Sequence, residues 1–197
     1  MARPKDDAAT AQRVADAVQT LLAHGGPQSV TIRAVAREAG CSTGLVMHAF
    51  ADRSSMLVHA RDVQRHAIDA LLEQVDADVA AGGSPAAALR ATLLLAAPDA
   101  EQVVDDRSRL GFVAAALDDA TLAEIQVSTN RRFVERVRTL VLLCRPGLVK
   151  LDAAAITLSL VGMTEGLGAL GACDPSLYTR AAREAAVDRA LAAYGLS

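Results

Sequence analysis

Apolar residues recur with a helical repeat along most of this chain, in segments separated by glycine and proline. Residues 7–23 show the pattern first: apolar side chains return every three or four positions, which places them on one face of a helix. Gly25, Gly26 and Pro27 follow directly and should end that helix. Hydrophobic residues make up 52% of the chain, many of them alanine, and aromatic residues only 3%. Close-packed helices rather than sheets are therefore expected, and the predicted fold class is all-α.

The same signals place the other helices. Thr31 can cap a short helix that ends at Gly40, and Ser42 can cap another that runs to about Phe50. Further helices are predicted over residues 54–81, 85–98, 100–117, 119–144, 152–172 and 175–194. The chain should thus begin with a three-helix unit of the helix-turn-helix type. A bundle of about six helices should follow, of which the long helix after residue 53 is the first.

The distribution of charge differs between the two parts of the chain. Residues 1–65 carry eight Lys or Arg against six Asp or Glu, whereas residues 66–197 carry twelve against seventeen. The N-terminal part is therefore the one compatible with a phosphate-bearing partner. We predict two domains, residues 1–53 and residues 54–197.

The sequence also limits the cellular setting. The N-terminus lacks the apolar core of a signal peptide. Apolar stretches are interrupted well before the roughly 18 residues of a membrane span, so no membrane helix is expected. Cys41, Cys144 and Cys173 are odd in number and far apart, which favours reduced thiols over a disulfide framework. These features predict a cytoplasmic protein.

Residues 31–53, TIRAVAREAGCSTGLVMHAFADR, carry most of the functional information. Ala36 and Gly40 are small, so two short helices can cross closely, and the glycine can adopt the left-handed conformation that a tight turn needs. Val46 and Phe50 are four residues apart and should face the core. The opposite face can enter a major groove, where its hydroxyl and imidazole groups can bond base edges and Leu45 can touch a thymine methyl. That face consists of Ser42, Thr43, Gly44, Met47 and His48.

This segment resembles the N-terminal signature of the TetR family of transcriptional regulators, T-x-R-x-[IVL]-A-x-x-A-G-[VC]-S-x-G-x-[LV]-[YM]-x-x-F, whose elements all occur here in order. The family most often has tyrosine where Met47 stands, and commonly lysine where Thr43 stands. The resemblance implies phosphate contacts from Thr31, Arg33 and Arg53. It also implies base and backbone contacts from the exposed residues of the second short helix, Ser42, Thr43, Gly44, Met47 and His48. The implied function is a ligand-responsive repressor, not an enzyme, that binds a double-stranded DNA operator.

The C-terminal part is more weakly similar to the branch of this family that includes the choline-responsive repressor of betaine synthesis. The similarity lies in the segments GFVAAALDDATLAEIQ and LVGMTEGLGALGACDP and in the last helix. In that branch the last two long helices of each subunit form a four-helix dimer interface, which implies a homodimer over a pseudo-palindromic operator. Small residues that permit close helix approach support this implication. The residues on the face concerned are Ala154, Leu158, Val161, Gly162, Glu165, Gly168 and Ala169.

The family also implies a small-molecule effector bound among the C-terminal helices. Polar residues in apolar surroundings are the candidates for its contacts: Arg107, Arg109, Asn130 and Glu165. Glu165 can equally serve as a hydrogen-bonded carboxylate of the dimer interface. A choline-like cation would require an aromatic cage. Beyond the DNA-binding end the aromatic residues are Phe112, Phe133, Tyr178 and Tyr194. Choline is therefore not predicted as the effector, which we expect to be small and substantially apolar.

Two other functions remain open from the sequence. His59, Asp62 and His66 recur close to one face of the long helix and could hold a metal, which would make the protein a metal-responsive regulator. The weak basic bias, with Thr43 and Met47 in place of the usual residues, would also suit a helical adaptor that does not bind DNA. No nucleophile arrangement, phosphate loop or dinucleotide fingerprint is present. We predict no cofactor, no bound metal and no membrane partner.

Overall fold

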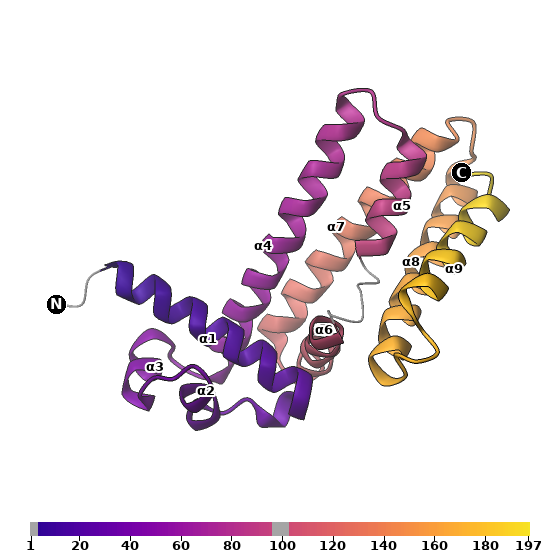
Figure 1. Ribbon diagram of the computed structural model, residues 1–197. Coiled ribbons are helices and arrows are strands. Elements are labelled where there is room, and N and C mark those ends of the chain that lie inside the picture. The colour runs from indigo at the N-terminus through magenta and orange to yellow at the C-terminus, as the bar shows by residue number, and fades with distance from the viewer. Residues whose placement is uncertain (1–3, 96–102) are drawn as a thin grey trace. The chain divides into compact units, whose positions relative to one another are not determined.

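The computed structural model describes residues 4–95 and 103–197, and every regular element in these ranges is helical (Figure 1). The elements are α1 (Pro4–Gly25), the 3₁₀ helix η1 (Pro27–Ser29), α2 (Ile32–Glu38), α3 (Thr43–Ala49), α4 (Arg53–Ala80), α5 (Pro85–Leu95), α6 (Val103–Ala115), α7 (Ala120–Cys144), α8 (Lys150–Cys173) and α9 (Arg180–Ala193). The predicted all-α class is confirmed, with a helix-turn-helix near the N-terminus and six further helices from α4 onward.

The predicted helix limits agree with the structure to within a few residues, except at the last helix. We predict a helix over residues 175–194, whereas α9 begins only at Arg180. The Asp174 carboxylate accepts the backbone amide of Leu177 at 3.2 Å and closes a turn there. Thr179 then caps α9 through its side chain. Two side-chain caps in succession thus outweigh the helical pattern. The predicted helix ends at residues 96–98 and 100–102 lie outside the described residues.

The helices form two compact units. One consists of residues 1–67 and 107–127, and the other of residues 68–106 and 128–197. Each of α4, α6 and α7 therefore contributes to both units. These boundaries differ from the division at residue 53, which concerns function and remains a prediction.

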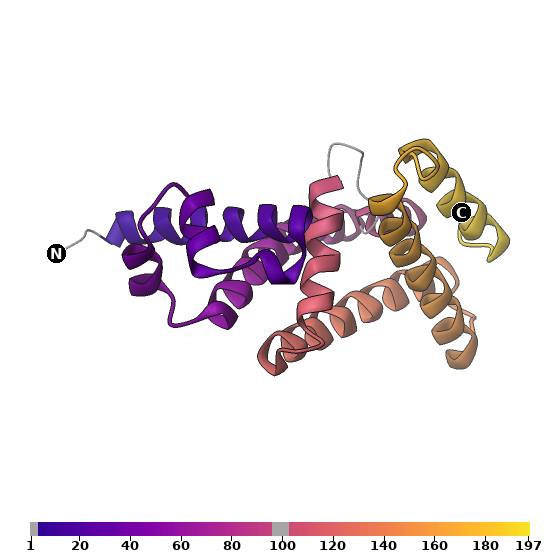
Figure 2. The same ribbon diagram turned by 90° about the horizontal axis from the view of Figure 1, so that it is seen from below.

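The first unit is built around α1, against which α2 and α3 pack (Figures 1 and 2). Its largest fully buried side chains come from α1, α2, α4, α6 and α7 and include Val14, Val18, Val35, Met56, Leu57, Phe112 and Leu122. Gly111 of α6 lies against Leu22 of α1, because a Cβ on Gly111 would stand 2.9 Å from the Leu22 Cβ. This close approach joins α6 to the helix that supports α2 and α3.

The second unit has its own apolar core. Its buried residues come from α5, α7, α8, α9 and the C-terminal tail, and include Leu89, Leu93, Val137, Val141, Leu160, Val187, Leu191 and Leu196. α8 and α9 pack against each other and run in opposite directions (Figure 1). α5 packs against both of them. The two helices that the sequence assigns to a dimer interface are therefore paired within the subunit.

Among the described residues, α8 is the helix whose length and composition would allow a membrane span, with a mean hydropathy of 1.4 in its most apolar window. The expectation that every apolar stretch is interrupted well before about 18 residues does not hold for this helix, and the absence of a membrane helix stays a prediction. That expectation counted Thr and Gly among the interrupting residues, although both are nearly neutral in hydropathy. A core helix of a soluble protein meets the same criteria, and 33% of the window is buried within the subunit.

Candidate nucleic-acid interface

Side-chain caps set the positions of α2 and α3. Thr31 accepts the amide of Ala34 at 3.2 Å, and Ser42 accepts the amide of Leu45 at 3.2 Å. Both predicted caps are confirmed. Each satisfies one of the amides that a helix leaves free in its first turn.

The turn between the two helices depends on Gly40, whose φ of +63° lies in the left-handed region. The amide of the next residue, Cys41, donates to the carbonyl of Ala36 at 2.9 Å and ties the turn back to α2. The predicted role of Gly40 is therefore confirmed, since glycine suits the positive φ, and Ala36 is buried where the two helices pack.

One side of α3 is held by the core of the first unit. Val46 is fully buried and Phe50 is 9% exposed, as their spacing predicts. The Phe50 ring also contacts the ring of His59 on α4, with centroids 5.3 Å apart. The orientation of α3 about its own axis is thus determined, and the other side of the helix must face outward.

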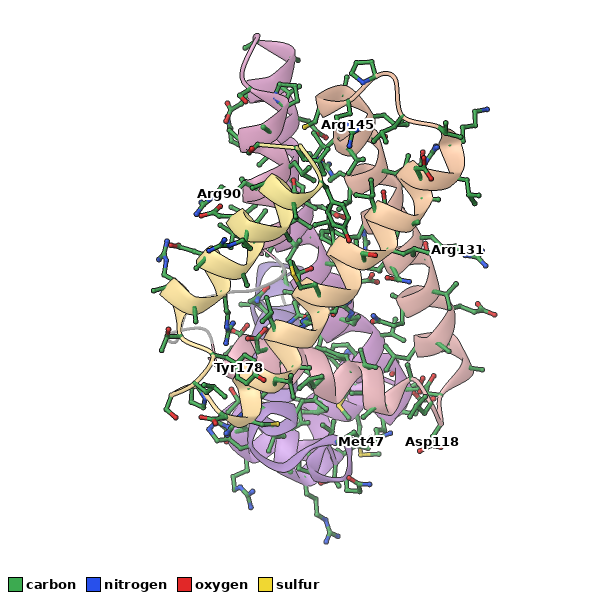
Figure 3. All side chains as sticks on the ribbon, turned by 90° about the vertical axis from the view of Figure 1, so that its right-hand side faces the viewer. Met47, Arg90, Asp118, Arg131, Arg145 and Tyr178 are labelled. Atoms are coloured by element: carbon green, nitrogen blue, oxygen red, sulfur yellow. The ribbon has the colours of Figure 1, made fainter. Side chains whose placement is uncertain are left out.

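The residues predicted to contact DNA from α3 and its cap are all exposed: Ser42, Thr43, Gly44, Met47 and His48. Met47 is 63% exposed, and Figure 3 labels it at the surface of the N-terminal helices. Thr31 and Arg33 are exposed as well. The structure therefore brings these residues together on one unit. Contact with DNA itself stays a prediction.

Arg37 is a basic residue of this surface that the sequence reasoning missed. It is exposed and lies in the last turn of α2, four residues after Arg33. That spacing puts both guanidinium groups on the same side of α2, and it was visible in the sequence. Glu38, exposed beside them, offsets part of this positive charge.

Arg53 differs from the other predicted phosphate contacts because it is half-buried and already bonded. Its Nη2 donates to the carbonyl of Pro27 at 2.7 Å and its Nε to the carbonyl of Val30 at 3.0 Å. The side chain thereby holds η1 and the entry to α2 against the start of α4. Sequence spacing contained no sign of this role, because the accepting atoms are backbone carbonyls.

Leu45 lies on the side of α3 that faces α1 and α4. It is half-buried and lines a hollow of about 410 Å³. The other lining residues are Thr10, Ala11, His48, Ala49, Phe50 and His59. Leu45 is thus less accessible than Met47, although the sequence suggested it as the contact for a thymine methyl.

The three residues suggested as metal ligands, His59, Asp62 and His66, each bond to another group of the protein. The Nε2–H of His59 donates to the carbonyl of Ala11 at 3.2 Å, and the Nδ1–H of His66 donates to the carbonyl of Asp62 at 2.7 Å. The Asp62 carboxylate pairs with Arg65. Within the described residues, no three His, Cys, Asp or Glu side chains gather as metal ligands would.

The four candidate effector contacts are divided between the units. Arg107 is exposed and Arg109 half-buried, both on α6 in the first unit. Asn130 is exposed on α7 and Glu165 half-buried on α8, both in the second unit. Neither unit by itself brings all four together, and their contact with an effector stays a prediction.

A buried ion pair in the second unit was not foreseen. Asp106, at 1% side-chain exposure, accepts from Nη1 of Arg183, at 3%, over 3.2 Å. The Nε of Arg183 donates to the carbonyl of Tyr178 at 2.8 Å. Gly171 makes the space, since a Cβ there would collide with the guanidinium group. The pair links the N-terminal part of α6 to α9, beside Gly171 of α8. Its two residues are too far apart in sequence for a periodic pattern to predict the contact.

Comparison with known proteins agrees with this architecture. Residues 15–60 match the family model of bacterial regulatory proteins of the tetR family, and residues 85–195 match that of the C-terminal domain of BetI-type transcriptional repressors. No curated protein matches the chain.

Solved structures with the same fold cover nearly the whole chain. A transcriptional regulator from Rhodococcus sp. Rha1 is 26% identical, with a TM-score of 0.79 over 93% of this chain and 95% of its own. A TetR-family regulator from Rhodococcus sp. is 20% identical, with a TM-score of 0.75 over 95% and 99%. A regulator from Saccharomonospora viridis, solved in complex with choline, is 14% identical, with a TM-score of 0.76 over 92% and 95%.

Proposed function

The chain belongs to the TetR family of transcriptional regulators, with a C-terminal domain of the BetI repressor type, and we propose that it represses transcription by binding a pseudo-palindromic operator as a homodimer that a small-molecule effector releases. The family is one of regulators rather than enzymes. We place the DNA contacts in residues 1–53 and the effector and dimer contacts in residues 54–197. A cytoplasmic location follows from this function.

The exposed face of α3 is the observation that carries the proposal for DNA binding. Its inner side is fixed by Val46 and Phe50, and its start is fixed by the Ser42 cap. The outer residues are short or flexible and carry hydroxyl, thioether and imidazole groups, which suit the edges of bases in a major groove. Arg33 and Arg37, exposed on α2, supply the positive charge that phosphates attract.

The proposed DNA binding can be tested by selecting fragments of the source genome with purified protein. Affinity for the selected site is then measured by fluorescence anisotropy at two salt concentrations. We expect one palindromic site, bound more weakly at higher salt because phosphate contacts release counterions. Arg33→Ala combined with Thr43→Ala should weaken binding. Arg131→Ala is the matched control, since Arg131 is an exposed arginine that points outward from α7 (Figure 3).

Two results would contradict the proposal. One is the absence of any selected site. The other is affinity that changes as much in the Arg131→Ala control as in the double variant. The first would favour a helical adaptor whose helix-turn-helix no longer binds DNA, and the second would mean that Arg33 and Thr43 make no specific contact with it.

The homodimer is supported by the outer face of α8. Leu151 is 78% exposed and Leu158 62%, a large apolar exposure for a helix of a soluble protein. Gly162 and Gly166 follow at helical spacing, and a Cβ on either would meet no atom within 4 Å. Glycine inside a helix lowers stability by about 1 kcal/mol relative to alanine. No contact within the subunit requires glycine at these two positions.

A second copy of the chain would account for this face. Small residues let two helices approach closely, and a two-fold axis near Gly162 would place Leu158 of one subunit opposite Gly166 of the other. The outer face of α9 is also lined by small residues, including Ala181, Ala185 and Ala192. We therefore propose that α8 and α9 of each subunit form the dimer interface.

The effector is proposed to bind among the C-terminal helices, with Arg107, Arg109, Asn130 and Glu165 as candidate contacts. Choline, present in the Saccharomonospora viridis structure, is not our first candidate here. Phe112 is fully buried, and the Arg61 guanidinium already lies over its ring at 5.7 Å. We propose a small, substantially apolar ligand.

The proposed switch is a shift of population. An effector that binds the DNA-free conformation more tightly than the DNA-bound one must weaken operator binding by the same coupling free energy. Candidate ligands, choline included, can be titrated into the operator complex while anisotropy is followed. A ligand that binds the protein but leaves operator affinity unchanged would contradict a role as the effector.

A further inference from the structure

α3 exposes no lysine or arginine along its length from Thr43 to Ala49. Guanine is most often read in the major groove by arginine or lysine, which bond its O6 and N7 atoms together. His48 is the one exposed side chain of α3 that can carry a positive charge. The outer face of α3 is therefore poorly equipped to read guanine and must recognise bases by other contacts.

Met47 is the large side chain of this outer face. It is 63% exposed, although Val46 before it is fully buried and Leu45 is half-buried against the hollow beneath α3. A methionine chain is apolar, flexible and polarisable. In the major groove the apolar feature that distinguishes bases is the C5-methyl group of thymine.

Gly44 lies one helical turn before Met47 on the exposed surface. A Cβ at this position would meet only the Ser42 hydroxyl oxygen, at 3.9 Å. The φ of Gly44 is not positive either, so neither space nor backbone conformation within the protein requires glycine. Because glycine weakens a helix, its presence here is best explained by something outside the protein that comes close to this turn.

We propose that Met47 reads the C5-methyl group of thymine in the operator, and that Gly44 lets α3 approach the base edges closely enough for this contact. The inference rests on the proposed function as a DNA-binding repressor. Thr43, four residues before Met47 and also exposed, adds a second methyl group on the same side of the helix. The half-site should therefore contain thymine at the base pairs beneath these residues.

The test replaces each thymine of the selected operator, one at a time, by deoxyuridine, which lacks only the methyl group. We expect one or two positions in each half-site where this change weakens binding about fourfold, as the loss of one buried methyl group predicts. In Met47→Ala, removal of the thymine methyl group opposite residue 47 should no longer weaken binding, because the side chain that contacts this methyl group is already absent. Met47→Gln, similar in length but polar, should behave in the same way.

Gly44→Ala provides a second test that separates binding from folding. Its free energy of unfolding should be equal to or above that of the unsubstituted protein, while operator affinity falls at least tenfold. Gly147→Ala, in the turn between α7 and α8, is a control away from α3, since a Cβ there also meets no atom within 4 Å, and its operator affinity should be unchanged.

The outcomes distinguish this inference from the function on which it rests. If the protein selects no DNA, both are overturned. If it binds an operator but no thymine is sensitive to loss of its methyl group, or the sensitivity persists in Met47→Ala, the role of Met47 is overturned and the repressor remains. A Gly44→Ala variant with full affinity would overturn the close approach.

Discussion

Arg53 has an implied role in DNA binding and an observed role in holding the fold. The resemblance to the TetR family implies a phosphate contact, whereas in the structure the same guanidinium group donates to the carbonyls of Pro27 and Val30. A guanidinium group has five N–H donors, so an internal role and a contact with DNA are chemically compatible. A loss of DNA affinity after substitution of Arg53 could therefore come from the missing phosphate contact or from the missing bonds to the two carbonyls.

Substitution of Arg53 by alanine should therefore lower stability as well as DNA binding. We expect the free energy of unfolding to fall by about 1 to 3 kcal/mol, the usual value for hydrogen bonds from a charged donor. Urea denaturation followed by circular dichroism measures this, with Arg131→Ala as an exposed control that should change little. A variant with normal stability and weakened operator binding would show that the carbonyl contacts contribute nothing and that only the phosphate role matters.

Asp119 provides a test of pH dependence within the first unit. It accepts the Ser54 hydroxyl and the Leu122 amide, and these bonds hold the pKa of its carboxyl below the ordinary value. A carboxyl whose pKa is lower in the folded state stabilises the protein above its unfolded pKa of about 3.9. That contribution is lost as the pH falls through the folded pKa.

Asp119→Ala should consequently be less stable than the unsubstituted protein by about 1 kcal/mol at neutral pH, the usual cost of losing a helix cap. The difference should be constant down to about pH 5 and shrink below about pH 4, where the carboxylate begins to take up its proton. Urea denaturation at several pH values would show this. A difference that is independent of pH down to 2 would mean that the ionised carboxylate is not the cap.

At the scale of helices, local interactions determine where a helix starts, and interactions distant in sequence determine how helices pack. The starts of α2, α3 and α9 depend on caps within four residues in sequence, formed by Thr31, Ser42 and Thr179. The packing of α9 on α8 involves residues distant in sequence: a shared apolar core, and the Arg183 guanidinium, which lies against Gly171 and bonds to Asp106 of α6. Removing a cap should loosen one helix end, whereas filling the space at Gly171 should displace the Arg183 guanidinium from its buried partners.

Gly171→Ala is expected to be strongly destabilising. A methyl group there would push the Arg183 guanidinium away and leave the Asp106 carboxylate buried without it, which typically costs about 3 to 5 kcal/mol. Thermal and urea denaturation can measure the change against Gly147→Ala, where a Cβ meets no atom within 4 Å. A loss below 1 kcal/mol would mean that Arg183 moves elsewhere at little cost.

For the molecule as a whole, the proposed homodimer would allow two α3 helices to bind one operator together. The outer face of α8 exposes Leu151 and Leu158 to water in the isolated subunit, so a partner that covers it would bury apolar surface. Two linked helix-turn-helix units also bind one DNA site far more tightly than a single unit does. Dimer and operator affinity should therefore be lost together.

Leu158→Arg tests this link. Leu158 is 62% exposed in the subunit, so the helices should form normally, but the charge would be buried without a partner in the proposed interface. We expect a monomer in sedimentation experiments, an unchanged helical circular dichroism spectrum and at least a hundredfold weaker operator binding. Leu117→Arg is the control, at a residue 83% exposed in the other unit. A Leu158→Arg protein that stays dimeric would place the interface elsewhere.

Local patterns were sufficient for the all-α class, the caps at Thr31 and Ser42, the turn at Gly40 and the inward positions of Val46 and Phe50. Each of these depends on neighbours within about one helical turn, which the chain specifies directly. The half-burial of Leu45, the bonds from Arg53 to two carbonyls and the Asp106–Arg183 pair were decided by the tertiary structure alone. They require segments distant in sequence to meet, and no periodicity encodes which distant atoms will do so.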